Sequence, residues 1–298
     1  MSLRGRATTE LLVRLANRPG QTLTVDGLRS LLGPPSTKDD AVKGVRVLRT
    51  ELGGVPAERY ELVSGTATGE LLAFHGGGYI AGTAQHFRSL FAALARTLGL
   101  RGTSLDYRLA PEHPFPAPIE DGLAAYRALL HSGAPPASVV LAGESAGGGA
   151  ALSTAIAARD EGLPAPRALI LYWPFVDCTL SGESLVSNAG RDFLTRDLVE
   201  LSASSFLAGH DAHDPLASPI FADLSGLPPI HLQVGERDLL RSDAERLADH
   251  LQEAGVSVEL HVVSNAVHGF ATSGDGLPEG RQSLGLVSRW WRDSASAG

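Results

Sequence analysis

The chain has 298 residues, of which 43% are hydrophobic and 19% are charged. A chain of this length can bury a full core, and these fractions argue against disordered, collagen-like and coiled-coil proteins. The net charge is −8 and the 25 basic residues are scattered, so we expect no nucleic-acid partner. The single cysteine, Cys178, excludes an internal disulfide and a cysteine-rich zinc site.

The beginning of the chain lacks the pattern of a secretory signal, because Arg14 interrupts the short apolar run at residues 11–13. No stretch approaches the roughly 18 consecutive apolar residues that a membrane span needs. The low cysteine content fits a reducing compartment. We therefore expect a cytoplasmic protein with no membrane span.

Helices and strands can be expected in chain order from the hydrophobic spacing. Residues 1–55 indicate a helical N-terminal segment, with one helix over residues 8–17 and a second that begins near Thr24 and ends at Gly33. The later pattern alternates between strands and helices. The expected strands are residues 59–63, 71–74, 102–107, 139–142, 168–171, 230–234 and 256–263, and the expected helices are residues 118–131, 146–159, 196–207, 242–255 and 282–291.

This alternation predicts an α/β fold, with a mostly parallel sheet, helices on both faces and ligands at the carboxyl ends of the strands. One stretch of over fifty residues, between the strand near residue 171 and the strand at residue 230, departs from the alternation. An insertion of this length usually forms a lid, a cap or a binding element.

The sequence G-E-S-A-G at residues 143–147 matches the pattern G-x-S-x-G and lies between an expected strand and an expected helix. Small residues on either side of the serine allow the sharp, strained turn that lifts its hydroxyl above the sheet. The amide of Ala146 then points a donor at the position of an oxyanion. The alternative is a glycine-rich turn with an incidental serine, but the context favours Ser145 as a nucleophile.

A second glycine run, H-G-G-G at residues 75–78, directly follows the expected strand at residues 71–74. Glycines let backbone N–H groups turn inward and approach a substrate, as further oxyanion donors must. A phosphate-binding loop or a plain turn is the alternative, but no G-x-G-x-x-G register fits the run. His75 is interpreted as a structural residue of this loop.

A nucleophilic serine needs a base, and the base needs a carboxylate that orients it. His268 alone among the ten histidines lies just beyond the last expected strand, where α/β-hydrolases carry their base. Asp238 follows the expected strand at residues 230–234 and precedes His268, which is the required order. Asp243 and Glu236 are close competitors by position.

Three other features resemble functional groups, but each has a simpler interpretation. His231 and His261 lie inside expected strands and are assigned to packing. The segment H-D-A-H-D at residues 210–214 resembles a metal site, but such loops are usually solvated, so we expect no metal there. Cys178 has no histidine placed to activate it and is interpreted as a bystander.

These motifs together resemble the hormone-sensitive-lipase-like family of serine esterases within the α/β-hydrolase superfamily. The resemblance covers about residues 71–270 and is carried by H-G-G-G at 75–78, D-Y-R-L-A-P-E at 106–112, F-P-A at 115–117, G-E-S-A-G-G at 143–148, S-P at 218–219, L-P-P at 227–229, D-L at 238–239 and H-G-F at 268–270. It implies Ser145 as nucleophile, His268 as base and acid, Asp238 as orienting carboxylate, and Gly77, Gly78 and Ala146 as oxyanion donors. His75, Gly76 and Glu144 complete the motifs, with Glu144 standing where the commoner pattern has Asp.

The resemblance also implies an activity and a domain organisation. The activity is hydrolysis of short- to medium-chain carboxylic esters through an acyl-enzyme, without metal or cofactor. The organisation is a catalytic domain over residues 56–298 and a helical cap made of residues 1–55 and an insertion at about 180–215. The alternatives are a lactone or N-acetyl (amide) hydrolase with the same machinery and, in another class, a non-catalytic small-molecule receptor. A homodimer through an edge strand at residues 256–263 is a further hypothesis.

Overall fold

The structure is a computed structural model that describes residues 10–11, 13–17, 23–34 and 42–296. These residues form one eight-stranded sheet in the order β1-β2-β4-β3-β5-β6-β7-β8. β2 pairs antiparallel with β1 and with β4, and every other neighbouring pair is parallel. The mostly parallel α/β sheet that the sequence predicted is confirmed.

The elements have the following bounds. The strands are β1 (Val45–Leu52), β2 (Val55–Leu62), β3 (Glu70–Phe74), β4 (Arg101–Leu105), β5 (Val139–Glu144), β6 (Ala168–Tyr172), β7 (Ile230–Gly235) and β8 (Val258–Val263). The labelled α-helices are α2 (Val25–Leu32), α3 (Arg88–Leu98), α4 (Ala117–His131), α5 (Ala146–Asp160), α6 (Ser184–Ser187), α7 (Arg196–Leu207), α8 (Arg241–Glu253) and α9 (Pro278–Ser296).

From β3 onward the expected elements agree with the observed ones to within a few residues, except that α3 and the short α6 were not expected. The largest difference lies earlier, because residues 45–52 were expected in a helical segment and instead form β1. β1 is an edge strand whose side chains are mostly exposed, so it lacks the alternation of apolar residues that would reveal a strand. Its backbone pairing with β2 determines its conformation.

The two helices expected before β1 are only partly described. Residues 10, 11 and 13–16 are helical, while residues 8, 9 and 12 of the first expected helix lie outside the described residues. The second is confirmed as α2, because the Thr24 hydroxyl accepts a hydrogen bond from the Gly27 amide at 3.0 Å and Gly33 follows its last turn.

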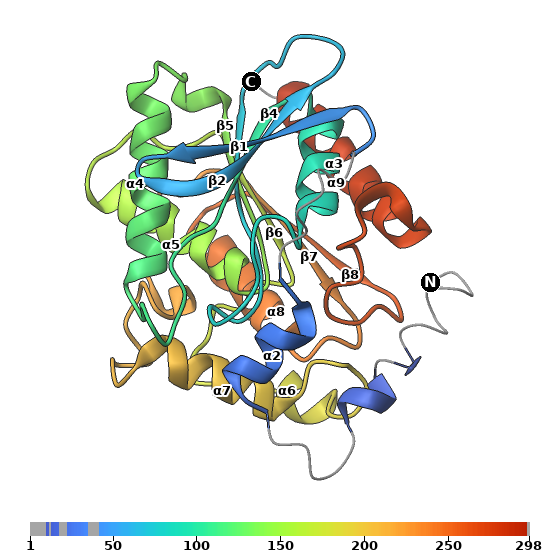
Figure 1. Ribbon diagram of the computed structural model, residues 1–298. Coiled ribbons are helices and arrows are strands. Elements are labelled where there is room, and N and C mark those ends of the chain that lie inside the picture. The colour runs from blue at the N-terminus through green and yellow to red at the C-terminus, as the bar shows by residue number, and fades with distance from the viewer. Residues whose placement is uncertain (1–9, 12, 18–22, 35–41, 297–298) are drawn as a thin grey trace.

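Helices cover both faces of the sheet, as Figure 1 shows. α4 and α5 pack against each other on one face, and α3 and α9 pack on the opposite face. α2, α6 and α7 gather instead at one end of the molecule (Figure 1). Within the described part of the chain, none of the helices combines the length and apolar character of a membrane span.

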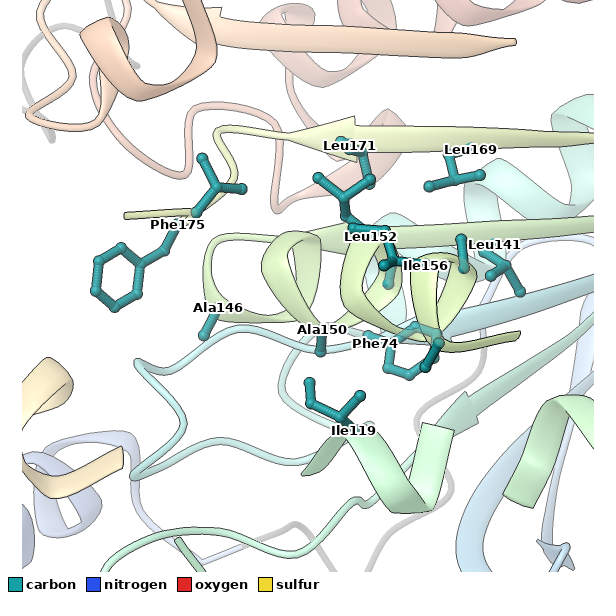
Figure 2. Close-up of a cluster of buried hydrophobic side chains, with 14 of the residues drawn as sticks. Phe74, Ile119, Leu141, Ala146, Ala150, Leu152, Ile156, Leu169, Leu171 and Phe175 are labelled. Atoms are coloured by element: carbon teal, nitrogen blue, oxygen red, sulfur yellow. The ribbon is translucent and has the colours of Figure 1, made fainter. Parts of the chain in front are cut away.

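The larger core lies between α5 and the central strands. Figure 2 shows Leu152 of α5 near Leu171 of β6 and Ile156 on the side of Leu141 of β5, while Ala150 points toward Ile119 of α4. These side chains are all buried. Burial of this kind stabilises a fold by about 1.5–3 kcal/mol for each large aliphatic side chain, so β5 and α5 form a rigid support for the turn that joins them.

Side-chain contacts fasten α2 to the rest of the protein. The Arg29 guanidinium donates to both Glu112 carboxylate oxygens at 2.7 Å, to the Ile80 carbonyl at 2.8 Å and to the Ala110 carbonyl at 3.0 Å. Because these partners belong to loops that follow β3 and β4, α2 is held over the carboxyl ends of the strands.

β8 occupies the far edge of the sheet, as expected for the last strand. The homodimer that was inferred from this edge stays a prediction. Detection of only a 31 kDa species by light scattering would contradict it.

The approach of α5 to β3 gives a stability prediction. A Cβ on Gly147 would overlap the carbonyl oxygens of Phe74 and His75, and backbone atoms cannot move away as a side chain can. We expect Gly147→Ala to lower the free energy of unfolding by about 2–4 kcal/mol in urea denaturation. Gly285→Ala is the matched control, because its Cβ would meet nothing closer than 3.8 Å and a helical alanine is favourable. Equal stability of both variants would contradict the packing argument.

Candidate active site

Ser145 lies at the sharp turn between β5 and α5, as the sequence predicted. Its backbone is in an uncommon region for a non-glycine residue, with φ 55° and ψ −125°, which costs about 1–3 kcal/mol. Hydrogen bonds hold this conformation, because the Ser145 amide donates to the Tyr172 carbonyl at 3.0 Å and its carbonyl accepts from the Phe175 amide at 2.9 Å. The Ser145 side chain is therefore held in a sharp turn that directs its hydroxyl away from the sheet.

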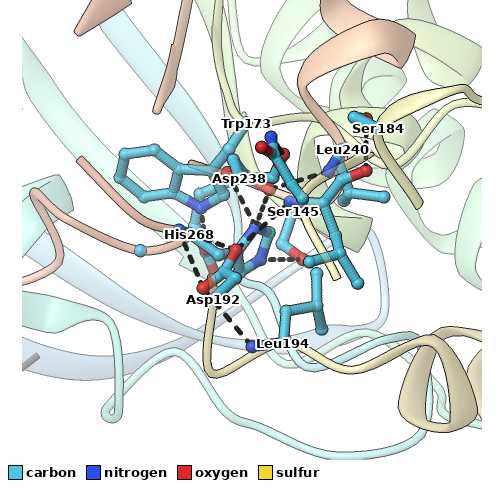
Figure 3. A network of polar contacts seen from close by, with 12 residues as sticks. Ser145, Trp173, Ser184, Asp192, Leu194, Asp238, Leu240 and His268 are labelled. Atoms are coloured by element: carbon cyan, nitrogen blue, oxygen red, sulfur yellow. Dashed lines mark hydrogen bonds and ion pairs between the residues drawn. The ribbon is translucent and has the colours of Figure 1, made fainter. Parts of the chain in front are cut away.

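The structure brings Ser145, His268 and Asp238 into one hydrogen-bonded chain, shown in Figure 3. His268 Nε2 lies 2.9 Å from Ser145 Oγ, and His268 Nδ1 lies 3.1 Å from both carboxylate oxygens of Asp238. Asp238 is fully buried just after β7, and His268 lies in the loop after β8. The three side chains thus come from the carboxyl ends of three parallel strands.

The competing carboxylates lie elsewhere. Glu236 accepts hydrogen bonds from the Asn265 amide at 2.7 Å and from the Ser264 hydroxyl at 3.1 Å, so it supports the loop after β8. Asp243 is buried in the first turn of α8. Asp238 is the carboxylate that contacts the imidazole.

The H-G-G-G loop lines the same cavity as Ser145. Gly77 and Gly78 both have positive φ, at 112° and 65°, a conformation that a side chain would oppose. His75 stacks on Tyr107 with ring centroids 4.3 Å apart, and burial lowers the pKa of His75 to about 4. A neutral, stacked imidazole agrees with the structural interpretation of His75.

A cavity of about 500 Å³ opens beside Ser145 and His268. This volume is typical of sites for small molecules. Its walls are mainly apolar and include Phe175, Leu28 from α2 and Leu198 from α7. Within the described residues, no cavity-lining side chain belongs to a group of three or more that could hold a metal ion. The arrangement offers a nucleophile, a base and an apolar binding space.

Comparison with known proteins agrees with this geometry. A sequence profile for the alpha/beta hydrolase fold matches residues 71–272. An acetyl-hydrolase of Streptomyces hygroscopicus is 40% identical over 230 residues, which cover 76% of this chain and 77% of that protein. A carboxylesterase of Mycobacterium tuberculosis is 36% identical over 223 residues, which cover 71% and 69% of the two chains.

Solved esterase structures agree with this chain in shape as well as in sequence. A hormone-sensitive lipase from a metagenome library has a TM-score of 0.89 and 37% identity, with 99% of this chain and 98% of that chain covered. The chain belongs to the hormone-sensitive-lipase-like esterases of the alpha/beta-hydrolase fold. It is a carboxylic ester hydrolase. The non-catalytic receptor considered from the sequence has no support among these relatives.

One residue of the esterase site, Asp192, was missed by sequence reasoning. Its carboxylate accepts hydrogen bonds from the backbone amides of His268 at 3.2 Å, Leu239 at 3.2 Å and Leu194 at 3.4 Å (Figure 3). Asp192 is 0% exposed, and burial together with the charge of Asp238 raises its pKa to about 7. It lies in the long segment between β6 and β7, where no motif or periodicity marks it.

Glu144 lies between Trp173 and the H-G-G-G loop in the esterase site. Its Oε2 accepts a hydrogen bond from Trp173 Nε1 at 2.7 Å, and a Cβ on Gly76 would overlap its carboxylate, so it lies directly under the H-G-G-G loop. Trp173 in turn packs edge-on against His268, with ring centroids 6.1 Å apart. Burial raises the pKa of Glu144 to about 7, against the opposing effect of the Trp173 hydrogen bond.

The buried carboxylates determine the charge state of His268. Burial by itself would lower the pKa of His268, but the charge and hydrogen bond of Asp238 raise it, with further contributions from Asp192 and Glu144. The resulting pKa is about 9. Only the neutral imidazole can take the serine proton, so this raised pKa places the active form of His268 at alkaline pH.

Proposed function

We propose that this esterase hydrolyses short- to medium-chain acyl esters with Ser145 as nucleophile, His268 as base and Asp238 as the carboxylate that orients it. The observation that carries the proposal is the 2.9 Å contact between Ser145 Oγ and His268 Nε2 at the edge of an apolar cavity. Asp238, on the other side of the imidazole, fixes its orientation.

The reaction then proceeds in two halves. His268 takes the Ser145 proton as the hydroxyl oxygen attacks the ester carbonyl, and the tetrahedral oxyanion is stabilised by the amides of Gly77, Gly78 and Ala146. His268 returns the proton to the departing alcohol, which leaves an acyl group on Ser145. A water molecule repeats the sequence, releases the acid and restores the hydroxyl.

The proposed acyl range rests on the size and lining of the cavity. About 500 Å³ with mainly apolar walls suits a short or medium chain and excludes a long one bound in full. The name of the acetyl-hydrolase relative favours small acyl groups and also supports an N-acetyl amide as a second candidate substrate. These candidates are ranked by measuring kcat/KM on a panel of substrates. The panel contains p-nitrophenyl esters from acetate to decanoate, lactones and N-acetylated amines.

We also propose that the segment over residues 1–55 and the insertion at about 180–215 together cover the catalytic domain over residues 56–298. α2 and α7, one from each piece, supply cavity-lining leucines. β1 is the exception within the first piece, because it belongs to the sheet. The cap therefore comprises the helical part of that piece.

The nucleophile is tested by Ser145→Ala. Removal of the hydroxyl leaves no atom to form the acyl-enzyme, so we expect kcat/KM for p-nitrophenyl butyrate to fall at least about a thousandfold. Ser204→Ala, on the exposed side of α7, is the control and should retain the wild-type rate. Activity in Ser145→Ala within tenfold of wild type would reject the assignment.

The role of Asp192 is tested by the pH profile of Asp192→Asn. His268 accepts a proton only when neutral, so kcat/KM rises with pH through the pKa of His268. Loss of the Asp192 charge disfavours the imidazolium and lowers that pKa, so the rising limb should move to lower pH by about 0.5–1 unit. Asp249→Asn, on the exposed side of α8, should leave the limb unchanged. A lower plateau with an unmoved limb would indicate a purely structural role.

The cap is tested by two leucines of the same helix. Leu28 lines the cavity, whereas Leu31 is 82% exposed. Leu28→Ala removes apolar contact with the substrate, so KM for p-nitrophenyl hexanoate should rise about three- to tenfold, with a smaller change for acetate. Leu31→Ala is the control and should leave both constants unchanged. Equal chain-length profiles for the two variants would contradict a role of α2 in binding.

A further inference from the structure

Three potential metal ligands meet on the last two strands, outside the active-site cavity. They are His231 on β7 and Glu259 and His261 on β8, and one ligand atom from each lies within 4.8 Å of the other two. His231 is opposite Glu259 in the parallel register, and His261 follows Glu259 by two residues. Alternate residues of a strand point to the same face, so the three side chains share one side of the sheet.

One ring nitrogen of His231 is buried without a hydrogen-bond partner. Its side chain is 0% exposed, and its Nδ1 has no hydrogen-bond partner in the structure. Buried polar atoms are nearly always paired, so an unpaired one needs an explanation. Nδ1 lies 3.9 Å from Glu259 Oε1, and Glu259 Oε1 lies 2.5 Å from His261 Nε2. The unpaired nitrogen therefore faces a carboxylate and a second imidazole.

We propose that His231, Glu259 and His261 bind one Zn²⁺ ion through Nδ1, the carboxylate and Nε2, with water as the fourth ligand. Two imidazoles and one carboxylate form a donor set that suits zinc and does not suit Mg²⁺ or Ca²⁺, which prefer oxygen. With metal–ligand bonds of about 2.0–2.2 Å, ligand atoms of a tetrahedral site lie about 3.3–3.5 Å apart. The two separations in the structure, 3.9 Å between His231 Nδ1 and Glu259 Oε1 and 2.5 Å between Glu259 Oε1 and His261 Nε2, lie on either side of this value.

The partly exposed ligands can make the adjustment. Glu259 is 45% exposed and His261 is 28% exposed, so both side chains can rotate and solvent can deliver the ion. His231 cannot move in the same way, because it packs on Trp290 with ring centroids 5.2 Å apart. His231 therefore stays in place, and the side chains of Glu259 and His261 rotate toward it when the ion binds.

Gln233 orients the fixed ligand. Its side-chain amide lies 2.9 Å from His231 Nε2, and it also bonds to Ser283 of α9. In the structure Gln233 Nε2 faces His231 and donates to the Ser283 carbonyl at 3.1 Å. Ligation through Nδ1 places the ring proton on Nε2, so the Gln233 amide turns its oxygen toward that nitrogen and gives up its hydrogen bond to the Ser283 carbonyl. Hydrogen bonding of the second ring nitrogen is the usual support for a ligating histidine.

The ion would fasten the edge strand of the sheet. β8 pairs only with β7 among the strands of the described chain, and it leads into the loop that carries His268. Zinc that bridges β7 and β8 binds the folded protein and has no comparable site in the unfolded chain. It therefore stabilises the native state by an amount that grows with the logarithm of the ratio of free zinc concentration to Kd.

The test is calorimetric titration of the metal-free protein with ZnCl₂. We expect one ion per chain in the wild type, and binding at least about tenfold weaker in Glu259→Gln and in His261→Gln. Both substitutions are at partly exposed positions, which avoids the folding risk of changing His231. His213→Gln is the matched control, because His213 lies 3.4 Å from Asp211 in the segment that the sequence suggested as metal-like. That variant should bind zinc as the wild type does, and MgCl₂ should give no binding.

A second readout separates binding from misfolding. Zinc should raise Tm of the wild type and of His213→Gln by several degrees, and raise that of His261→Gln by much less. All variants should hydrolyse p-nitrophenyl butyrate at the wild-type rate in EDTA, because the cluster does not line the cavity. Zinc affinity unchanged by Glu259→Gln and His261→Gln would overturn the proposal, as would an effect confined to His213→Gln.

Discussion

The active site depends on a backbone turn that is unfavourable in isolation. Ser145 has a positive φ without being glycine, and a free peptide would relax from this conformation. It persists because β5 lies between β3 and β6 in the middle of the sheet, and because α5 packs closely against β3 at Gly147. The buried core on this side of the sheet thus supplies the free energy that keeps the serine hydroxyl exposed to the cavity.

A second constraint is electrostatic. Asp238, Asp192 and Glu144 are all buried around the single imidazole of His268. Each carboxylate is costly to bury alone, which explains the raised pKa of Asp192 and Glu144. Together they favour a positive charge on His268. Backbone amides donate to Asp192, and Trp173 donates to one of the two oxygens of Glu144. The same buried charges therefore position the loops and stabilise the imidazolium that forms when His268 takes the serine proton.

The two edges of the sheet serve different purposes. At one edge the mostly exposed β1 pairs antiparallel with β2, and α2 and α7 lie away from this edge at the end of the molecule that Figure 1 shows. At the other edge β8 carries two of the proposed zinc ligands and leads to the His268 loop. Edge strands lack a neighbour on one side, and the proposed ion would add a second link between β8 and β7.

Much of this protein follows from the sequence alone. The G-x-S-x-G turn, the H-G-G-G loop and the order of Ser145, Asp238 and His268 depend on local backbone requirements and on strand ends, which periodicity reveals. Tertiary structure decided what local sequence does not encode. β1 is a strand because β2 pairs with it, and Asp192 meets His268 only because a long loop folds back over the sheet. His231 and Glu259 are opposite each other only in the paired sheet. Local rules specify the conformation of neighbouring residues, whereas these contacts join segments far apart in the chain and exist only once the sheet has formed.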